Sequence, residues 1–363
     1  MNLIFLLALT SSFVQLALSN HYNGGVYTST MPDNKTITFK FQVYYRRAGT
    51  GTIVACDDTT IKTQALVTDP SAANIQIAYC KSTTGLCTGT TNVAYNFRCQ
   101  NYDIANNWAQ FANTVNLTLN YATLKTYDSV EFSLPTSGNW ALFTAYKYYW
   151  SHINRVVVGN TPPYVIAFPM LKVKCGCTVV FKPLIIDDDS GDFVKCRKSL
   201  AANGESGGTT YTSTFLLNET TCSVTFPSTL KTSVAIELQL EDFNKNYMNG
   251  TVAKSSTSFQ FNGVLSTCVA LPNCNNVPKF TNSLDPSNST IVLTYNTVFK
   301  DRVEAYSTGD TVTEIRIFKD FVGFNYNQAV LMYNASTGIS YYDFNMTVTD
   351  LKVECESFIQ IFQ

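Results

Sequence analysis

Histidine and charged residues are scarce in this sequence. Only two of its 363 residues are histidine, 14% are charged, and the formal net charge is −1. A Ser-His-Asp or Cys-His catalytic arrangement needs a histidine that a partner side chain orients. His21 lies at the predicted mature N-terminus, so His152 is the one serious candidate. The composition therefore argues against histidine-dependent nucleophilic catalysis.

Clusters of basic residues are also missing. The longest basic cluster is the pair Arg46-Arg47, in a strand-like context. Binding to the phosphates of nucleic acid requires a concentrated basic face. We therefore expect no nucleic acid partner for this chain.

Long hydrophobic runs are lacking after the first residues, which read MNLIFLLALTSSFVQLALS. The apolar centre and the small residues Ala17 and Ser19 are typical of a signal peptide that is cleaved after residue 19. The alternative is a membrane anchor, which needs about 20 mostly apolar residues, and polar residues from Thr10 to Gln15 interrupt this run. The sequence predicts a secreted, extracellular protein with no transmembrane segment after the signal peptide.

Helical periodicity is hard to find, whereas apolar residues alternate with polar ones along much of the chain. The alternation is clear in TITFKFQVYY (36–45), SVAIELQLEDF (233–243), TSFQFNGVL (257–265) and ISYYDFNMTV (339–348). Such alternation buries one face of a strand and leaves the other in solvent. Turn residues separate the runs, as between the strands of antiparallel sheets. The sequence predicts an all-β fold of tandem antiparallel β-sandwich modules.

Two proline-containing stretches indicate module boundaries. Thr161-Pro162-Pro163 follows the long predicted strand NWALFTAYKYYWSHINRVVV, and proline cannot donate to a strand ladder. The stretch CVALPNCNNVPKF (268–280) has the composition of a second junction. We therefore expect a signal peptide over residues 1–19 and three modules over residues 20–160, 161–267 and 275–363.

Eleven cysteines follow the predicted signal peptide. In a secreted chain they indicate disulfides, and a zinc site is disfavoured because histidine is rare and the cysteine spacing is wrong. Their clustering predicts pairing inside the first module among Cys56, Cys80, Cys87 and Cys99, and inside the second among Cys175, Cys177, Cys196 and Cys222. Cys268 and Cys274 are expected to close a small loop. Cys355 is left either free or paired with another chain.

Seven N-x-S/T sequons are spread along the chain. They begin at Asn34, Asn116, Asn218, Asn249, Asn288, Asn334 and Asn345. Sequons also arise by chance, but together with a signal peptide they predict a glycoprotein, and each modified asparagine must face solvent.

A cluster of acidic residues follows an apolar run in LIIDDDSGDFVKC (184–196). One interpretation is a solvated hairpin turn, because Asp and Gly are common turn residues. The other is a calcium loop, in which alternate carboxylates line one side of a bend and Ca²⁺ takes about six to eight oxygens. The position-12 ligand of an EF-hand is missing, so both interpretations stay open. The candidate metal ligands are Asp187, Asp189, Asp192 and, at the end of a predicted strand, Asp242.

The stretch from Asn160 to Ser199 resembles a segment of uncharacterised invertebrate extracellular multi-domain glycoproteins. Their pattern is an N-x-x-P linker, a Gly-Cys, and D-x-D-G-D-x-V-x-C-R-W. The matching residues are Asn160, Pro163, Gly176, Cys177, Asp187, Asp189, Asp192, Val194, Cys196 and Arg197. The chain departs from the pattern at Lys198, where the family often has Trp, and at the inserted Ser190. The resemblance implies extracellular β-modules and no established activity.

The acidic stretch also resembles cadherin repeats, whose D-A-D-S-G loop binds calcium, so the middle module is expected to be cadherin-like. The first functional hypothesis is a non-enzymatic extracellular glycoprotein of adhesion, recognition or matrix structure that binds an extracellular protein or glycan. The second is a secreted binder of carbohydrate or a small ligand that uses strand-face aromatics such as Trp150. The third is a secreted hydrolase with a carboxylate pair, taken from the Asp187–Asp192 cluster or from Glu241 and Asp242.

Overall fold

The computed structural model describes much of the chain after residue 20 as strands, turns and short helices. The described residues are 21–31, 33, 36–47, 56–63, 65–68, 76–82, 88–92, 96–104, 107–118, 129–140, 149–157, 159–167, 170–187, 189–203, 205, 215–230, 233–265, 274, 279–281, 298–307, 312, 314–319, 324–327, 331–348 and 357–362. The predicted signal peptide therefore lies outside the described residues.

The chain forms two compact units. The first contains Met1–Val165, Pro169–Leu171 and Val180–Leu265, and the second contains Ile166–Phe168, Lys172–Val179 and Ser266–Gln363. The division into modules at residues 160 and 267–275 stays a prediction.

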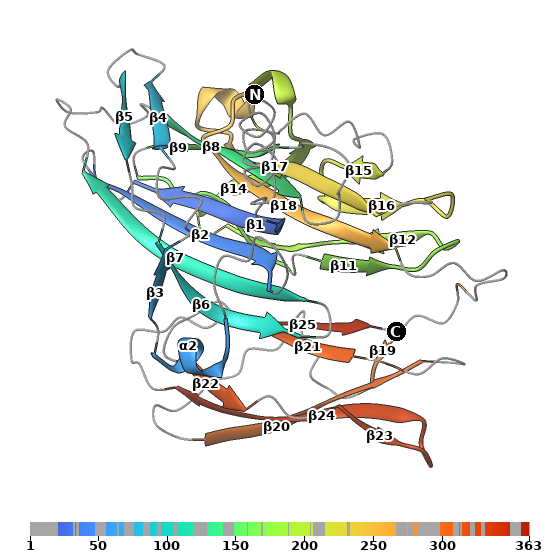
Figure 1. Ribbon diagram of the computed structural model, residues 1–363. Helices are drawn as coiled ribbons and strands as arrows, with labels where there is room; N and C mark the ends of the chain where they lie inside the picture. The colour runs from blue at the N-terminus through green and yellow to red at the C-terminus, as the bar shows by residue number, and fades with distance from the viewer. Residues whose placement is uncertain are drawn as a thin grey trace, which may run out of the picture. The chain divides into compact units, whose positions relative to one another are not determined.

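A large sheet dominates the first unit (Figure 1). Its strands are β1 (His21–Thr30), β2 (Thr36–Arg46), β3 (Leu66–Thr68), β4 (Gln76–Ser82), β5 (Thr88–Asn92), β6 (Asn96–Asp103), β7 (Trp108–Thr118), β8 (Ser129–Trp140), β9 (Tyr149–Val157), β11 (Met170–Val173), β14 (Asp192–Lys198), β17 (Val234–Asn244) and β18 (Ser255–Leu265). The main order is β14-β17-β18-β9-β8-β1-β2-β7-β6-β3, with an additional β18–β1 pairing. Among the described strands of this sheet, neighbours pair antiparallel except for the short parallel contact of β1 with β8.

A second, smaller sheet packs against one face of the large sheet. It has the order β12 (Val179–Phe181), β16 (Ser223–Phe226) and β15 (Leu216–Asn218). The ring centroid of Phe181 lies 5.3 Å from that of Phe261 in β18. A Cβ atom on Gly263 of β18 would lie 2.7 Å from the Phe226 ring, so glycine allows this close approach. The predicted all-β fold with antiparallel sandwich packing is confirmed.

Alternation of side chains along β17 and β18 explains this packing. Ile236, Leu238 and Leu240 of β17 and Phe261 of β18 are fully buried. They occupy alternate positions, as the patterns in 233–243 and 257–265 predict. Burial of each large apolar side chain contributes about 1.5–3 kcal/mol. The polar residues between them, such as Glu237, Gln239 and Gln260, are buried as well, so the expectation of one solvent-exposed face is wrong for these two strands, which are covered on both faces.

Aromatic rings form another part of the core of the first unit, between β1, β2, β6 and β7. Phe97 packs edge-on against Phe41 and Tyr45, with ring centroids 5.6 and 6.1 Å apart. Phe111 lies 6.2 Å from Tyr45 and 6.0 Å from Phe97. Edge-to-face pairs at these separations add to the stabilisation from burial. The aromatic content of the sequence is therefore used, in these strands, for packing.

The second unit contains a five-stranded antiparallel sheet and a strand pair. The sheet has the order β19 (Lys279–Phe280), β20 (Val298–Tyr306), β24 (Ile339–Val348) and β22 (Phe324–Asn327), with β23 (Met332–Asn334) also paired to β24. The separate pair is β21 (Glu314–Lys319) with β25 (Ser357–Phe362), and β10 (Tyr164–Ile166) pairs β13 (Leu184–Ile186) elsewhere in the chain.

Helix is limited, in the described residues, to short segments such as α2 (Asp58–Thr63), η2 (Ala201–Asn203) and η4 (Met248–Gly250). The alternating pattern of apolar residues does not predict α2. Asp57 caps it, because the backbone N–H of Thr60 donates to Asp57 Oδ1 at 2.8 Å and the N–H of Asp57 donates to Thr60 Oγ1 at 2.8 Å. A side-chain cap of this kind stabilises a turn of helix without any apolar stripe.

Three disulfides lie within the described residues. Cys56–Cys99 and Cys196–Cys222 agree with pairing inside the first two predicted modules. The third, Cys177–Cys274, spans 97 residues. Two expectations are therefore wrong: that Cys274 closes a small loop with Cys268, and that Cys177 pairs inside the second predicted module. Sequence spacing failed here because a cysteine pairs with whichever thiol the fold brings within bonding distance.

Candidate metal site

Asp187, Asp192 and Asp242 come together in the first unit. Asp187 directly follows β13, Asp192 opens β14, and Asp242 lies near the end of β17. In the β14–β17 ladder Val194 pairs with Asp242, and Asp192, two residues earlier, shares the face of Val194. Asp242 also continues the face of Leu240, so the same alternation that buries the core of β17 buries this carboxylate.

Asp242 is held in a fully buried position, with 0% of its surface exposed. The backbone N–H and the hydroxyl of Ser255 donate to its Oδ1 atom at 2.5 and 2.6 Å. The Nδ2 group of Asn160 donates to its Oδ2 atom at 2.8 Å. These three donors fix the orientation of the carboxylate, and they compensate part of the cost of burying it.

Asp192 is bound by a cationic and an amide side chain. The Nζ atom of Lys254 lies 2.5 Å from Asp192 Oδ2 and 4.0 Å from an oxygen of Asp189. The Nδ2 group of Asn244 donates to Asp192 Oδ1. Lys254 is thus the cation that the chain itself places against the acidic residues.

Asp187 and Asn160 each present a buried oxygen without a hydrogen-bond donor among the described residues. These atoms are Asp187 Oδ2 and Asn160 Oδ1. Asp187 Oδ1 accepts a hydrogen bond from the backbone N–H of Asp189 at 3.0 Å, and only 4% of Asn160 is exposed. A buried acceptor without a donor costs about 1–3 kcal/mol. A cation bound among the aspartates would satisfy the Asp187 oxygen.

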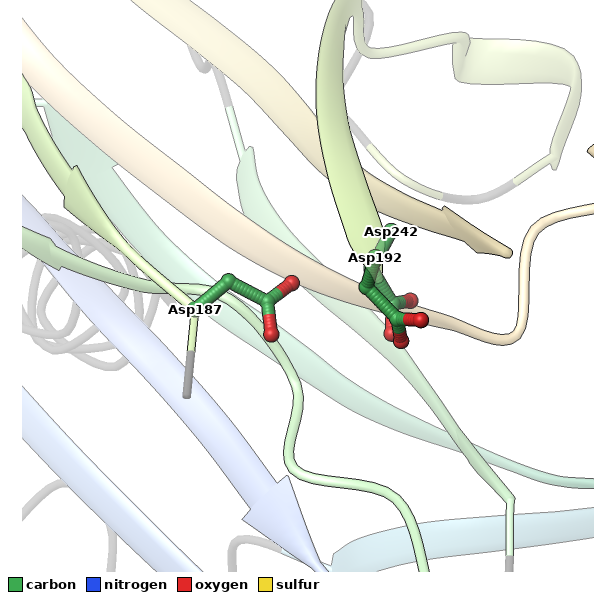
Figure 2. Close-up of side chains that lie close together, drawn as sticks. All are labelled: Asp187, Asp192 and Asp242. Atoms are coloured by element: carbon green, nitrogen blue, oxygen red, sulfur yellow. The ribbon is translucent and has the colours of Figure 1, made fainter. Parts of the chain in front are cut away.

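One carboxylate oxygen from each of Asp187, Asp192 and Asp242 lies within 4.8 Å of the other two. In Figure 2 the carboxylate of Asp187 faces those of Asp192 and Asp242, which come from neighbouring strands. The ammonium group of Lys254 lies against Asp192 and, at 4.0 Å, against the neighbouring Asp189. The triad can hold a metal ion, and its oxygen-only donor set fits a hard cation.

The pKa values follow from burial and from the crowding of negative charge. Burial, together with the charges of the other three aspartates, raises the pKa of Asp187 to about 6. Burial also raises the pKa of Asp242, against the hydrogen bonds from Ser255 and Asn160. Although burial disfavours its charge, the pKa of Lys254 is raised because Asp192, Asp189 and Asp242 attract its proton. The cluster therefore favours bound positive charge.

Three of the four metal ligands predicted from the sequence meet in the structure, and the fourth does not. Asp187, Asp192 and Asp242 meet, whereas Asp189 uses its Oδ2 atom to accept the backbone N–H of Thr161 at 2.8 Å. Sequence reasoning did not assign Asn160 or Lys254 to the site. For Asn160 the only sequence signal was its place in the N-x-x-P motif. For Lys254 no sequence signal indicated a place at this site.

Glu241, which the hydrolase hypothesis paired with Asp242, points to a different network. It accepts a hydrogen bond from the Nε group of Arg197 at 2.9 Å. The same guanidinium forms a two-pronged pair with Glu205, with both distances at 2.6 Å. Glu241 and Asp242 are thus engaged by separate partners on opposite faces of β17.

Other candidates from the sequence have no described side chain. His152, Tyr149 and Trp150 lie in β9 and Trp140 lies in β8, but their side chains are outside the description, as are residues 141–148 and Asp188. The hypotheses that rest on these side chains stay predictions.

Four sequon asparagines are described with their side chains, and each is exposed. They are Asn116 in β7, Asn218 in β15, Asn249 in η4 and Asn334 in β23. Asn34 and Asn288 lie outside the described residues, and the side chain of Asn345 is not described. Exposure at these four positions is compatible with glycan attachment.

Comparison with known proteins does not assign a family. No protein-family model and no curated protein matches the chain. Among solved structures the chain is similar to a marsupial T cell receptor, with 8% identity and a TM-score of 0.20 over 95% of this chain and 99% of that one. A likeness this low carries no argument about function. Among the described residues, no helix is long and apolar enough to cross a membrane.

Proposed function

We propose that this chain is a secreted, non-enzymatic glycoprotein of extracellular adhesion, recognition or matrix structure, stabilised by Ca²⁺ at the acidic site. Three disulfides and an antiparallel β-sandwich are compatible with an extracellular protein. The exposed sequons support the same proposal. Its partner is an extracellular protein or glycan.

The observation that carries the calcium proposal is the pair of buried oxygens without donors beside three converging carboxylates. Asp187, Asp192, Asp242 and the amide oxygen of Asn160 would supply ligands. Ca²⁺ accepts such mixtures of carboxylate and amide oxygens in irregular geometry. Zn²⁺ prefers nitrogen and sulfur, and Mg²⁺ demands near-ideal octahedral geometry with several waters.

A structural rather than catalytic role follows from how the carboxylates are used. Asp242 accepts three hydrogen bonds and Asp192 is paired with Lys254. Groups locked in this way position the ends of β13, β14 and β17 relative to one another. A bound cation would join residues from these strands and from the segment at Asn160, which stabilises the sandwich.

The test is thermal unfolding of the secreted protein with Ca²⁺ and with a chelator. At a free concentration of about 100 times Kd, ligand adds about 2.7 kcal/mol to the native state. For a unit of this size we expect Ca²⁺ to raise Tm by about 5–10 °C. Asp187→Asn should strongly reduce this increase while raising the Tm of the metal-free protein, because it removes a buried charge and keeps the acceptor for the Asp189 N–H.

The matched control is Asp343→Asn, an exposed carboxylate paired with Arg302 in the second unit. This variant should keep the full response to Ca²⁺. Equal Tm values with calcium and with chelator in the unmodified protein would contradict the calcium proposal. A loss of response in Asp343→Asn as well would show that the effect is not specific to the site.

A further inference from the structure

Two strands of the β12-β16-β15 sheet carry an exposed apolar side chain on its outer face. In the β15–β16 ladder Leu217 pairs with the buried Val224, so Leu216 and Asn218 point to the opposite, outer face. Leu216 is 68% exposed. Val180 of β12 is 63% exposed, and its neighbour Phe181 is directed into the core. Apolar side chains on two strands of this sheet thus face outward.

A sequon sits on this same face. Asn218 follows Leu216 by two residues, which places the two side chains about 7 Å apart on one side of the strand. The Oδ1 atom of Asn218 accepts hydrogen bonds from the backbone N–H groups of Thr220 and Thr221 at 3.1 and 3.0 Å. These bonds fix the carboxamide and leave its Nδ2 group, the atom that carries an N-linked sugar, without a hydrogen-bond partner among the described residues.

We propose that Asn218 carries an N-linked glycan whose first N-acetylglucosamine covers Leu216 and shields the outer face of the β12-β16-β15 sheet. A pyranose ring presents C–H groups on its faces, and contact with Leu216 removes apolar surface of both from water. The sugar is thus a structural part of the module. The covered face is then unavailable to a protein partner. This inference rests on the proposed secretion of the chain.

Two other strand-borne sequons have a described side chain. Asn334 in β23 also follows an exposed apolar residue, Met332, by two positions, whereas Asn116 lacks this arrangement. Asn116 lies in β7 and follows Thr114, a polar residue, by two positions. Its Oδ1 atom accepts a hydrogen bond from the hydroxyl of Thr38 at 2.8 Å. A glycan at Asn116 would extend into solvent without covering an apolar side chain. Asn116 therefore provides a matched control for Asn218.

The experiment uses the full chain secreted from eukaryotic cells. Glycopeptide mass spectrometry should show a glycan at Asn218. Asn218→Gln and Thr220→Ala should each lower Tm by about 2–4 °C, whereas Asn116→Gln should change it by no more than about 1 °C. Trimming all glycans to a single N-acetylglucosamine should leave Tm unchanged, because the first sugar makes the contact.

A double-mutant cycle separates the contact from the mere presence of sugar. In a Leu216→Thr background, Thr220→Ala should no longer lower Tm, although the Leu216→Thr single variant still carries the Asn218 glycan. Thr220→Ala removes the sequon but keeps the Asn218 side chain that accepts from the Thr220 and Thr221 N–H groups. An unmodified Asn218 beside other occupied sequons would overturn this inference and leave the proposed extracellular function standing, and so would an equal cost of Thr220→Ala in both backgrounds. Absence of glycan from every sequon, with the chain retained in the cell, would overturn both.

Discussion

At the scale of single residues, the acidic site shows how position in a strand decides the state of a side chain. Asp242 occupies an alternate position on the core face of β17, so it is buried as its apolar neighbours are. The sequence identified this carboxylate because it ends an alternating run. It did not identify Asn160 or Lys254, which lie 82 residues from Asp242 and 62 residues from Asp192. Local pattern carries no information about such distant contacts.

Acidification should weaken the response to Ca²⁺. The pKa of Asp187 is raised to about 6, above the value of about 3.9 for an unfolded chain. A raised pKa makes the contribution of Asp187 to the stability of the metal-free protein greatest at low pH, and this contribution is lost as pH rises through about 6. Between pH 7 and pH 5 protons therefore compete with metal, and the increase in Tm caused by Ca²⁺ should shrink steeply.

Calorimetry of Ca²⁺ binding from pH 5 to pH 8 measures this effect. Asp187→Asn lacks the titrating group, so its residual affinity should vary less with pH. An affinity that is unchanged across the range in the unmodified protein would refute the competition.

The pKa of Glu205 shifts in the opposite direction from that of Asp187. Although burial opposes its charge, its hydrogen bonds with Arg197 lower its pKa. Its contribution to stability is therefore lost only under more acidic conditions.

At the scale of secondary-structure elements, β1 joins parts of the first unit that are distant in sequence. It pairs with β2 along most of its length and also with β18 through Gly25, Val26 and Tyr27. A register shift lies between Tyr22 and Gly24, and Gly24 has a φ angle of 141°. A Cβ atom there would lie 2.4 Å from the backbone oxygen of Gln260. The close approach of β1 to β18 therefore requires glycine.

Gly24→Ala should destabilise the first unit by about 3 kcal/mol or more, because it combines backbone strain with a clash against backbone atoms that cannot rotate away. Urea unfolding followed by tryptophan fluorescence measures the loss. Gly159→Ala is the control in the same unit, since Gly159 has a φ angle of 76° but no neighbouring atom within 4 Å of the added Cβ. It should cost about 1 kcal/mol. Similar costs for the two variants would disprove the steric role of Gly24.

The strand predictions succeeded where alternation was strong. The patterns at 36–45, 233–243, 257–265 and 339–348 correspond to β2, β17, β18 and β24. Of the alternating run NLTLNYATL (116–124), only residues 116–118 are among the described residues, and they end β7, which already begins at Trp108. Its earlier part, WAQFANTV, alternates less regularly because Asn113 and Thr114 interrupt the apolar positions. Strand existence is thus a local property, whereas strand ends depend on the partner strand.

At the scale of the whole molecule, the chain forms two compact units, and a disulfide ties distant segments of the second one. Cys177 and Cys274 both belong to this unit, although 97 residues separate them in sequence. A crosslink over so long a loop restricts the unfolded chain strongly. The bond thus holds the Lys172–Val179 segment to the part of the unit that begins at Ser266.

Replacing both cysteines by serine should lower the stability of the second unit by about 2–4 kcal/mol. Each single substitution, Cys177→Ser or Cys274→Ser, should cost about as much as the double one, because all three break the same bond. Urea unfolding and counting of free thiols measure the two quantities. Additive costs of the single substitutions would show that the two cysteines stabilise the fold through separate contacts.

By itself, the sequence determined that this protein is built of β-strands, because a period of two is the local signature of a strand. It did not decide which strands are covered on both faces, as β17 and β18 are. It also placed the acidic residues at a turn after a strand. Only the tertiary structure decided which groups meet there. Pairing of β14, β17 and β18 brings Asp192, Asp242, Lys254 and Ser255 together, and Asn160 joins them from another part of the chain. Such encounters depend on distances across folded sheets, which no local pattern of residues encodes.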